Sequence, residues 1–152
     1  MAGQMHTANV AGISVSAANT PQDLIVLTAA SNRAVKIHQV IVSQLTLIAS
    51  EILSIKLHRG TGGSGGSAMT EVPLNDGSGV SGAAVVYSRT TQTTEADLLY
   101  AENWNVVQPF RWLPTPLLIP TITGGSNFVV ELETDASATM DMNLSISYEE
   151  IG

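Results

Sequence analysis

The stretch ATMDMNLSISYE, from Ala138 to Glu149, alternates apolar and polar residues without interruption. Its apolar positions are Ala138, Met140, Met142, Leu144, Ile146 and Tyr148, and its polar positions are Thr139, Asp141, Asn143, Ser145, Ser147 and Glu149. A period of two residues is typical of a β-strand with one buried face and one face in water. This stretch therefore predicts a long strand close to the C-terminus.

The stretch before it alternates in the same way. Phe128, Val130 and Leu132 are separated by Val129, Glu131 and Glu133, which predicts a second strand. Residues 134–137 lie between the two strands and include an aspartate, a residue type common in turns. We therefore expect the two strands to pair with each other as a C-terminal hairpin.

Further strands are predicted towards the N-terminus. Residues 35–42 and 53–58 alternate, whereas residues 23–28 form an apolar run that indicates burial on both faces. Residues 83–89, 106–113 and 117–123 are further predicted strands, and residues 5–16 are a candidate for one or two edge strands. Residues 94–102 fit either a short helix capped by Thr94 or a strand, and the sequence leaves both open.

The composition agrees with a fold made of strands. The chain has 152 residues, of which 15 are Ser and 15 are Thr, and only 12% are charged. A typical soluble domain has roughly 25% charged residues, and exposed helix faces favour long charged side chains. We therefore predict one domain over residues 1–152, all-β, built as an antiparallel sandwich or barrel with at most one short helix.

Charge and cysteine content exclude several classes of function. The net charge is −7, and the six basic residues form no cluster, which argues against a nucleic-acid groove or an anionic membrane surface. The chain has no cysteine, which excludes disulfides and thiolate catalysis. It has neither an apolar run of about 18 residues nor a signal-peptide pattern, so we expect no membrane span and synthesis in the cytoplasm.

Motifs for cofactors are incomplete. Residues 60–65 match the spacing of a dinucleotide-binding loop, but no helix follows them, so we interpret them as a flexible loop between strands. His6, His38 and His58 lack the spacing of metal ligands. We interpret His38 and His58 as two surface histidines that could face each other across paired strands.

Acidic residues gather in the C-terminal region. Glu131, Glu133 and Asp135 share one face of a strand, and Asp141 would lie opposite them across the hairpin. These carboxylates could hold Ca²⁺ or could form a solvated polar face, although a calcium-binding loop motif is missing. The sequence predicts no metal, no cofactor and no enzymatic activity.

Residues 104–120 form the most unusual stretch. They contain both tryptophans and prolines at positions 109, 114, 116 and 120, which places the stretch at a sheet edge because proline cannot donate to a sheet. The aromatic residues could cap the core, or they could form an interface, since Trp and Arg are frequent in binding hot spots. The candidate interface residues are Trp104, Phe110, Arg111, Trp112, Pro114 and Pro116.

Four segments resemble parts of a group of short proteins encoded by tailed bacteriophages. They are Lys36–Val40, Glu51–Gly60, Arg111–Pro116 and Ser147–Gly152, and the resemblance extends from about Gln22 to the C-terminus. It is a resemblance of strand pattern and contains no catalytic motif. It implies a small, jelly-roll-like β-sandwich that serves as a structural part of the virion, and capsid decoration (cement) proteins fit best.

This resemblance implies specific partners. The protein would bind the major capsid protein on the outside of the capsid, reinforce subunit junctions and self-associate, most simply as a homotrimer. It would be made in the host cytoplasm and end on the capsid surface of the virion. Two alternatives remain: a phage tail, neck or baseplate component, and a carbohydrate- or ligand-binding module with Trp104 and Trp112 as its aromatic platform.

Overall fold

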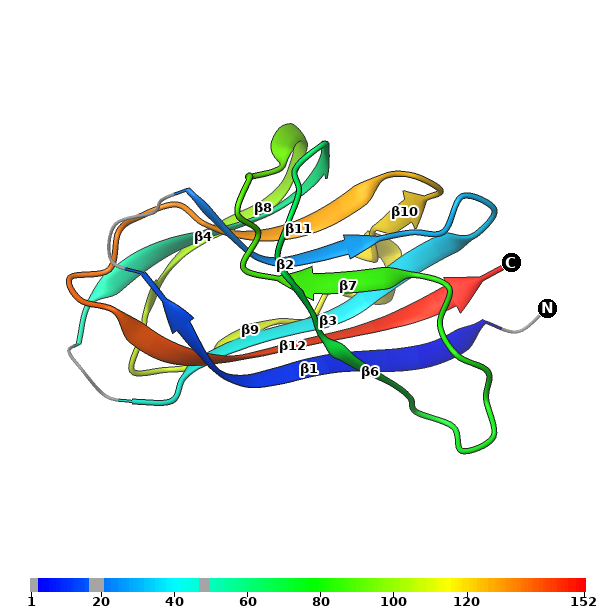
Figure 1. Ribbon diagram of the computed structural model, residues 1–152, viewed down its shortest axis with the longest axis horizontal. Helices are drawn as coiled ribbons and strands as arrows, with labels where there is room; N and C mark the ends of the chain where they lie inside the picture. Colours follow the sequence, from blue (N-terminus) through cyan, green and yellow to red (C-terminus); the bar gives the residue numbers. More distant parts are fainter. Residues whose placement is uncertain (1–2, 17–20, 47–49) are drawn as a thin grey trace.

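Two antiparallel sheets pack face to face in the computed structural model, which describes residues 3–16, 21–46 and 50–152 (Figure 1). The strands are β1 (Gln4–Val15), β2 (Gln22–Thr28), β3 (Ala34–Gln44), β4 (Ile52–Thr61), β5 (Ser67–Ala68), β6 (Thr70–Pro73), β7 (Ala84–Tyr87), β8 (Thr94–Asn105), β9 (Phe110–Trp112), β10 (Thr121–Thr123), β11 (Asn127–Leu132) and β12 (Met140–Ile151). The helical content of the described residues is one 3₁₀ turn, Pro116–Leu118. No helix in these residues is long and apolar enough to cross a membrane. The predicted all-β sandwich is confirmed.

The strand order identifies the topology. Sheet A has the order β10-β3-β12-β1-β6, with β9 also paired to β3, and sheet B has the order β5-β7-β2-β11-β4-β8. Without the short strands β5, β6 and β7, and with β9 and β10 taken as one interrupted edge strand, eight strands remain in chain order. Sheet A then holds the first, eighth, third and sixth, and sheet B the second, seventh, fourth and fifth. This arrangement of two four-stranded antiparallel sheets is a jelly roll.

The expected C-terminal hairpin is wrong. β11 pairs with β2 and β4 in sheet B, whereas β12 pairs with β1 and β3 in sheet A. Residues 133–139 therefore carry the chain from one sheet to the other. A period of two residues shows which side chains face the core, but it does not show which strand is the neighbour. Residues 94–102, for which helix and strand were both open, belong to the strand β8.

The burial of β12 follows its sequence pattern. Its residues alternate between buried and half-buried positions from Met140 to Ile151, and Met140 to Tyr148 supply inner-face side chains to the core. Phe128, Val130 and Leu132 of β11 face them from sheet B. In β2, by contrast, every residue from Gln22 to Leu27 is buried, which confirms the burial on both faces predicted for this run.

An insertion between β4 and β8, residues 62–93, covers one edge of the sandwich. Its strand β6 extends sheet A beside β1, and its strand β7 extends sheet B beside β2 (Figure 1). The insertion continues against the outer face of sheet B, where Asp23 bonds to Gln92 and Thr93. It therefore shields the open edges of both sheets and explains why β2 is buried on its outer side.

The glycine-rich loop is not the free flexible loop that its composition predicts. Ser64 and Thr91 exchange two backbone hydrogen bonds, each 3.1 Å long. The carbonyl oxygen of Gly62 accepts hydrogen bonds from Arg89 at 2.6 Å and from Asn127 at 3.2 Å. The glycines permit this close approach of two chain segments, because larger residues would collide with the backbone opposite.

Candidate functional site

A groove lies between the edge strands of the two sheets on the side opposite the insertion. β8 is the edge of sheet B there, and β9 and β10 form the edge of sheet A. The groove between β8 and the β9–β10 connection has a volume of about 410 Å³. We call it the edge groove; it is lined by Leu99, Tyr100, Arg111, Trp112, Leu113, Pro114, Thr115, Leu118 and Pro120.

Prolines create this groove by interrupting the edge strand. The predicted strands at 106–113 and 117–123 are reduced to β9 and β10, which pair with different parts of β3. Pro116 begins the 3₁₀ turn that fills the gap between them. Because this turn lies outside the sheet, it leaves Leu113, Leu117 and Leu118 exposed by 63%, 96% and 72%. Three large apolar side chains within six residues are an unusual surface feature.

Of the six predicted interface residues, two lie in the core and four lie at or beside the edge groove. Trp104 and Phe110 are core residues, with exposed fractions of 6% and 2% and ring centroids 6.0 Å apart. The indole Nε1 of Trp104 donates to the carbonyl oxygen of Gln108 at 3.0 Å, which satisfies its polar atom inside the fold. The prediction that these two residues lie at an interface is therefore wrong. Trp104 lies in β8 and Phe110 in β9, and both precede the turn at Pro116, so each strand still places its aromatic side chain in the core.

The other four predicted residues lie at or beside the edge groove. Trp112 is half-buried, and its ring stacks on the core residue Phe128 with centroids 6.1 Å apart. Arg111 is exposed and has no ion-pair partner among residues 3–16, 21–46 and 50–152. Pro114 lines the groove, and Pro116 is exposed at the start of the adjoining turn. Tyr100 and Leu118 were missed, because only the packing brings β8 beside the proline-rich segment.

The two rims of the edge groove carry opposite charges. Arg111 stands on the β9 side, whereas Glu102 is exposed on β8. The Tyr100 hydroxyl donates to Glu102 Oε2 at 2.5 Å, and this hydrogen bond raises the pKa of Tyr100. The other exposed acids of β8 are already paired within the chain, Glu95 with Lys56 and Asp97 with Arg59. Among the described residues, Arg111 thus makes no ion pair, and Glu102 bonds to a neutral hydroxyl and to no cation.

A second cluster of polar residues is buried on the outer face of sheet B. Asp23 of β2, His58 of β4 and Glu131 of β11 have exposed fractions of 0%, 0% and 5%. His58 Nε2 lies 3.5 Å from Glu131 Oε2, and Asp23 Oδ2 accepts hydrogen bonds from the amide and hydroxyl of Thr93 at 2.7 Å and 2.6 Å. Three neighbouring strands thus place two carboxylates and an imidazole together.

The pKa values in this cluster reflect burial and mutual attraction. Burial raises the pKa of Glu131, and the neighbouring His58 only partly offsets that effect. For His58, burial alone would lower the pKa, but the Glu131 carboxylate and the Arg59 carbonyl outweigh it, so the pKa is raised. The pKa values of His58 and Glu131 are thus both raised, His58 by its polar neighbours and Glu131 by burial.

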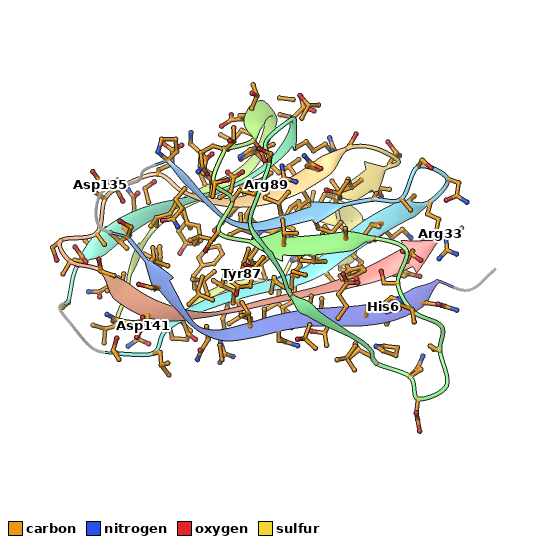
Figure 2. The ribbon with its side chains drawn as sticks, viewed as in Figure 1. His6, Arg33, Tyr87, Arg89, Asp135 and Asp141 are labelled. Carbon is orange, nitrogen blue, oxygen red and sulfur yellow. The ribbon has the colours of Figure 1, made fainter. Side chains whose placement is uncertain are left out.

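The predicted grouping of carboxylates does not form. Asp141 lies in sheet A, away from the sheet that holds Glu131, although Asp135 and Asp141 lie near the same end of the molecule (Figure 2). Glu133 pairs with Lys56 at 2.5 Å, which lowers the pKa of Glu133 and raises that of Lys56. Only Glu131 of the four joins a cluster that could bind an ion. The prediction failed because it placed Asp141 opposite Glu131 in a hairpin, whereas the two strands lie in different sheets.

The histidines also differ from the prediction. His58 is fully buried in sheet B, while His38 lies in sheet A, 3.4 Å from Glu149, so the two do not face each other. His6 is fully buried too and stacks on Tyr148 with ring centroids 5.5 Å apart. The interpretation of His38 and His58 as surface residues is therefore wrong for His58, whereas the sequence predicted neither burial nor exposure for His6. His6 shares the inner face of β1 with the core residue Ala8, whereas His58 lies on the outer face of sheet B, against which the end of the insertion packs.

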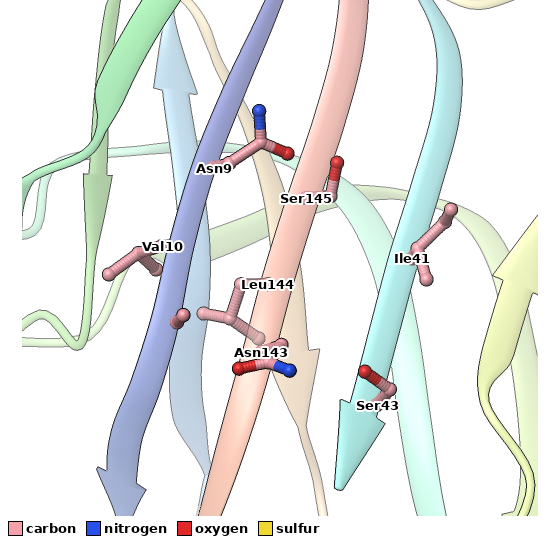
Figure 3. Close-up of a pocket in the computed structure, with 8 residues that line it drawn as sticks. Asn9, Val10, Ile41, Ser43, Asn143, Leu144 and Ser145 are labelled. Carbon is pink, nitrogen blue, oxygen red and sulfur yellow. The ribbon is translucent and has the colours of Figure 1, made fainter. Parts of the chain in front are cut away.

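A shallow hollow of about 460 Å³ lies on the outer face of sheet A (Figure 3). It forms beside a β-bulge in β1, where the register with β12 shifts between Val10 and Ile13. Its lining is small and uncharged, with Asn143 accepting a hydrogen bond from the Gly12 amide at 3.0 Å. Such a surface can form hydrogen bonds with a partner, but it offers no acid, base or nucleophile pair for catalysis.

Together, the fold and the edge groove define a jelly-roll β-sandwich with an apolar, proline-interrupted edge. No protein-family model matches the chain, and no curated protein matches it either. Among solved structures, VP17, a capsid protein of bacteriophage P23-77, aligns over 100% of this chain and 99% of that chain, with 11% sequence identity and a TM-score of 0.20. A TM-score that low does not establish a shared fold, so the topology rests on the strand order described above.

Proposed function

We propose that the protein is a structural component of a phage virion that binds the outside of the capsid as a decoration protein. The edge groove carries this proposal, because it is an apolar surface with no partner inside the described part of the chain. Two further observations support it: viral capsid domains are among the proteins that use the jelly-roll topology, and four segments resemble phage structural proteins. The jelly-roll topology is only an analogy of fold, and one fold serves many functions, so the edge groove is the stronger support for the proposal.

The occupant we propose for the edge groove is a second copy of this chain. Exposed leucines at positions 113 and 118 border the groove, and monomers seldom leave contiguous apolar patches in water. Arg111 and Glu102 stand on opposite rims, so a neighbouring copy would bring an acid to the arginine and a base to the glutamate. A contact repeated in both directions across one groove gives a twofold dimer, whereas a head-to-tail contact gives a ring when the rotation between copies closes. We propose the ring, because the resemblance implies a trimer. A homotrimer is the smallest such ring.

The mechanism of decoration would be mechanical. An oligomer placed over a junction of the major capsid protein adds buried surface across that junction. Each copy needs to contribute only a few kcal/mol, because linked binding sites act together. The outer face of sheet A, with its uncharged hollow, is left free for this contact.

A solution measurement of mass tests the proposed self-association. We expect a trimer for the parent and a shift towards monomer for Leu118→Asp, which puts a charge on the groove rim. Val80→Asp is the matched control, since Val80 is 90% exposed on the insertion and lies outside the groove. A parent of about 16 kDa at tens of micromolar would contradict the proposed assembly.

Sedimentation with purified particles tests the proposed location. We expect the parent to sediment with bare capsids and Leu118→Asp to bind them more weakly. Binding to tails, necks or baseplates in place of capsids would instead favour the alternative location in the virion. The carbohydrate-binding alternative needs Trp104 and Trp112 side by side as an aromatic platform. It has less support, because Trp104 is buried and Trp112 alone of the two reaches the surface.

A further inference from the structure

The cluster of Asp23, His58 and Glu131 has polar atoms that nothing in the described residues satisfies. Asp23 Oδ1 and His58 Nε2 are both buried and make no hydrogen bond. A buried polar atom without a partner costs about 1–3 kcal/mol, and a charged one costs more. One ligand atom from each of the three side chains lies within 4.8 Å of the others. The three side chains therefore bring ligand atoms to one small space, and two of them, Asp23 and His58, have an unsatisfied atom.

The tautomer of His58 indicates that a cation is needed between its imidazole and the two carboxylates. His58 Nδ1 lies 3.1 Å from the carbonyl oxygen of Arg59, which can only accept, so Nδ1 carries a hydrogen. In a neutral imidazole, Nε2 then presents a lone pair towards the carboxylates of Asp23 and Glu131. Lone pairs facing carboxylates repel each other unless a cation lies between them. The cation is either a proton on Nε2 or a metal ion.

We propose that Asp23, His58 and Glu131 bind a divalent transition-metal ion such as Zn²⁺. Zn²⁺ bonds of about 2.0–2.2 Å place neighbouring ligand atoms of a tetrahedral site about 3.3–3.6 Å apart. The distance of 3.5 Å between His58 Nε2 and Glu131 Oε2 falls in this range and is long for a hydrogen bond. A divalent ion also balances the two carboxylate charges, whereas a proton on His58 leaves one of them uncompensated.

The surroundings fit a metal site. Metal-bound histidines usually donate their other nitrogen to a carbonyl or carboxylate, as His58 Nδ1 does to Arg59. The amide and hydroxyl of Thr93 hold Asp23 Oδ2, which leaves Oδ1 free to coordinate. One nitrogen and two carboxylate ligands suit Zn²⁺ and its neighbours in the first transition row, while Ca²⁺ prefers six to eight oxygens.

The nearby cations have other partners. Lys56, which pairs with Glu131 in the sheet register, binds Glu133 and Glu95 through its ammonium group. Arg89 donates from Nη1 to the carbonyl oxygen of Gly62 and to the hydroxyl of Thr93. Neither makes an ion pair with Asp23 or Glu131 within the residues that the structure describes. The charge of these two carboxylates is thus available to a bound ion.

Calorimetric titration of the EDTA-stripped, desalted protein with Zn²⁺ tests this proposal. We expect one tight site per chain and a higher melting temperature with Zn²⁺. His58→Gln and Glu131→Gln should each weaken binding on the order of tenfold or more. The matched controls are His38→Gln and Glu149→Gln, which alter the other close histidine–glutamate pair, in sheet A, and should bind Zn²⁺ like the parent.

Two measurements keep the test decisive if a ligand variant fails to fold. Thr93→Val keeps the shape of the side chain but removes a hydrogen bond to Asp23, so it should weaken Zn²⁺ binding about tenfold. Nitrogen-15 NMR of the parent should show that Zn²⁺ shifts Nε2 of His58 and leaves His38 unchanged. The proposal is overturned if Zn²⁺ does not saturate one site, if Nε2 of His58 stays protonated with Zn²⁺ present, or if the controls lose binding together with the ligand variants.

Discussion

The carboxylate of Glu150 accepts a hydrogen bond of 2.8 Å from the backbone amide of Ala83, although 67 residues separate them in the sequence. The same carboxylate accepts another from the Gly82 amide at 2.8 Å and pairs with Arg33, which lies near the end of β12 (Figure 2). Glu150 is 4% exposed, so these bonds form out of contact with water. Together with the bonds from Thr93 to Asp23, they fasten the insertion to the sandwich.

Glu150→Ala should therefore destabilise the protein. It would remove an acceptor from the amides of Gly82 and Ala83 and leave Arg33 without its ion-pair partner, at a cost of about 1–3 kcal/mol in total because the Ser81 hydroxyl still accepts from Ala83. Urea unfolding would measure the loss, and limited proteolysis should cut first within residues 62–93. Glu149→Ala is the control, because its side chain is only half-buried and we expect a change within about 0.5 kcal/mol. Equal stability of the two variants would refute this anchoring role.

The acid sensitivity of the protein should depend on the same carboxylate. Burial raises the pKa of Glu150, but Arg33 and the amides of Ala83 and Gly82 outweigh this, so the pKa is lowered from its ordinary value of 4.5. A lowered pKa stabilises the folded state above the unfolded value, and this stabilisation is lost as the pH falls through the folded pKa. The difference in unfolding free energy between the parent and Glu150→Gln should shrink below about pH 4.5. A difference that stays constant from pH 7 to pH 3 would exclude this linkage.

Gly66 and Gly77 form a matched pair of glycines. Their φ angles are +89° and +85°, so an alanine is strained at either position by about 1–2 kcal/mol. A Cβ atom at Gly66 would lie 2.7 Å from the carbonyl oxygen of Tyr87, whereas one at Gly77 meets nothing within 4 Å. Gly66→Ala should therefore lower the unfolding free energy more than Gly77→Ala. Thermal unfolding of both variants compares them, and similar melting temperatures would show that the contact with Tyr87 relaxes easily.

Substitutions of Trp112 and Arg111 should have different effects on the stability of the monomer and on its self-association. Trp112→Ala should cost the monomer about 2 kcal/mol or more, because the ring stacks on Phe128 in the core. Arg111→Ala should change the unfolding free energy by less than about 0.5 kcal/mol but weaken self-association, because Arg111 is exposed and unpaired in the described chain. Denaturation and solution mass measure the two effects. Unchanged assembly of Arg111→Ala would place the contact elsewhere.

The edge groove could be predicted only in part. Prolines 114, 116 and 120 indicate an interrupted edge, and Trp112 with Arg111 indicates a binding surface, all from local composition. Trp104 has the same composition around it but lies in the core, because β8 continues through it without a break. Tyr100, on the other rim, is brought there by the packing of β8 beside β9, and no local pattern indicates that.

Most strands can be located from local sequence patterns, because the alternation of side chains follows from the geometry of a single extended chain. The run ATMDMNLSISYE thus defines β12 and its buried face without reference to any other segment. Long-range packing, in contrast, pairs β12 with β1 and β3 and places β11 in the other sheet. It also decided that Asp23, His58 and Glu131 meet, since side chains from three separate strands come together only when long-range pairing fixes their register.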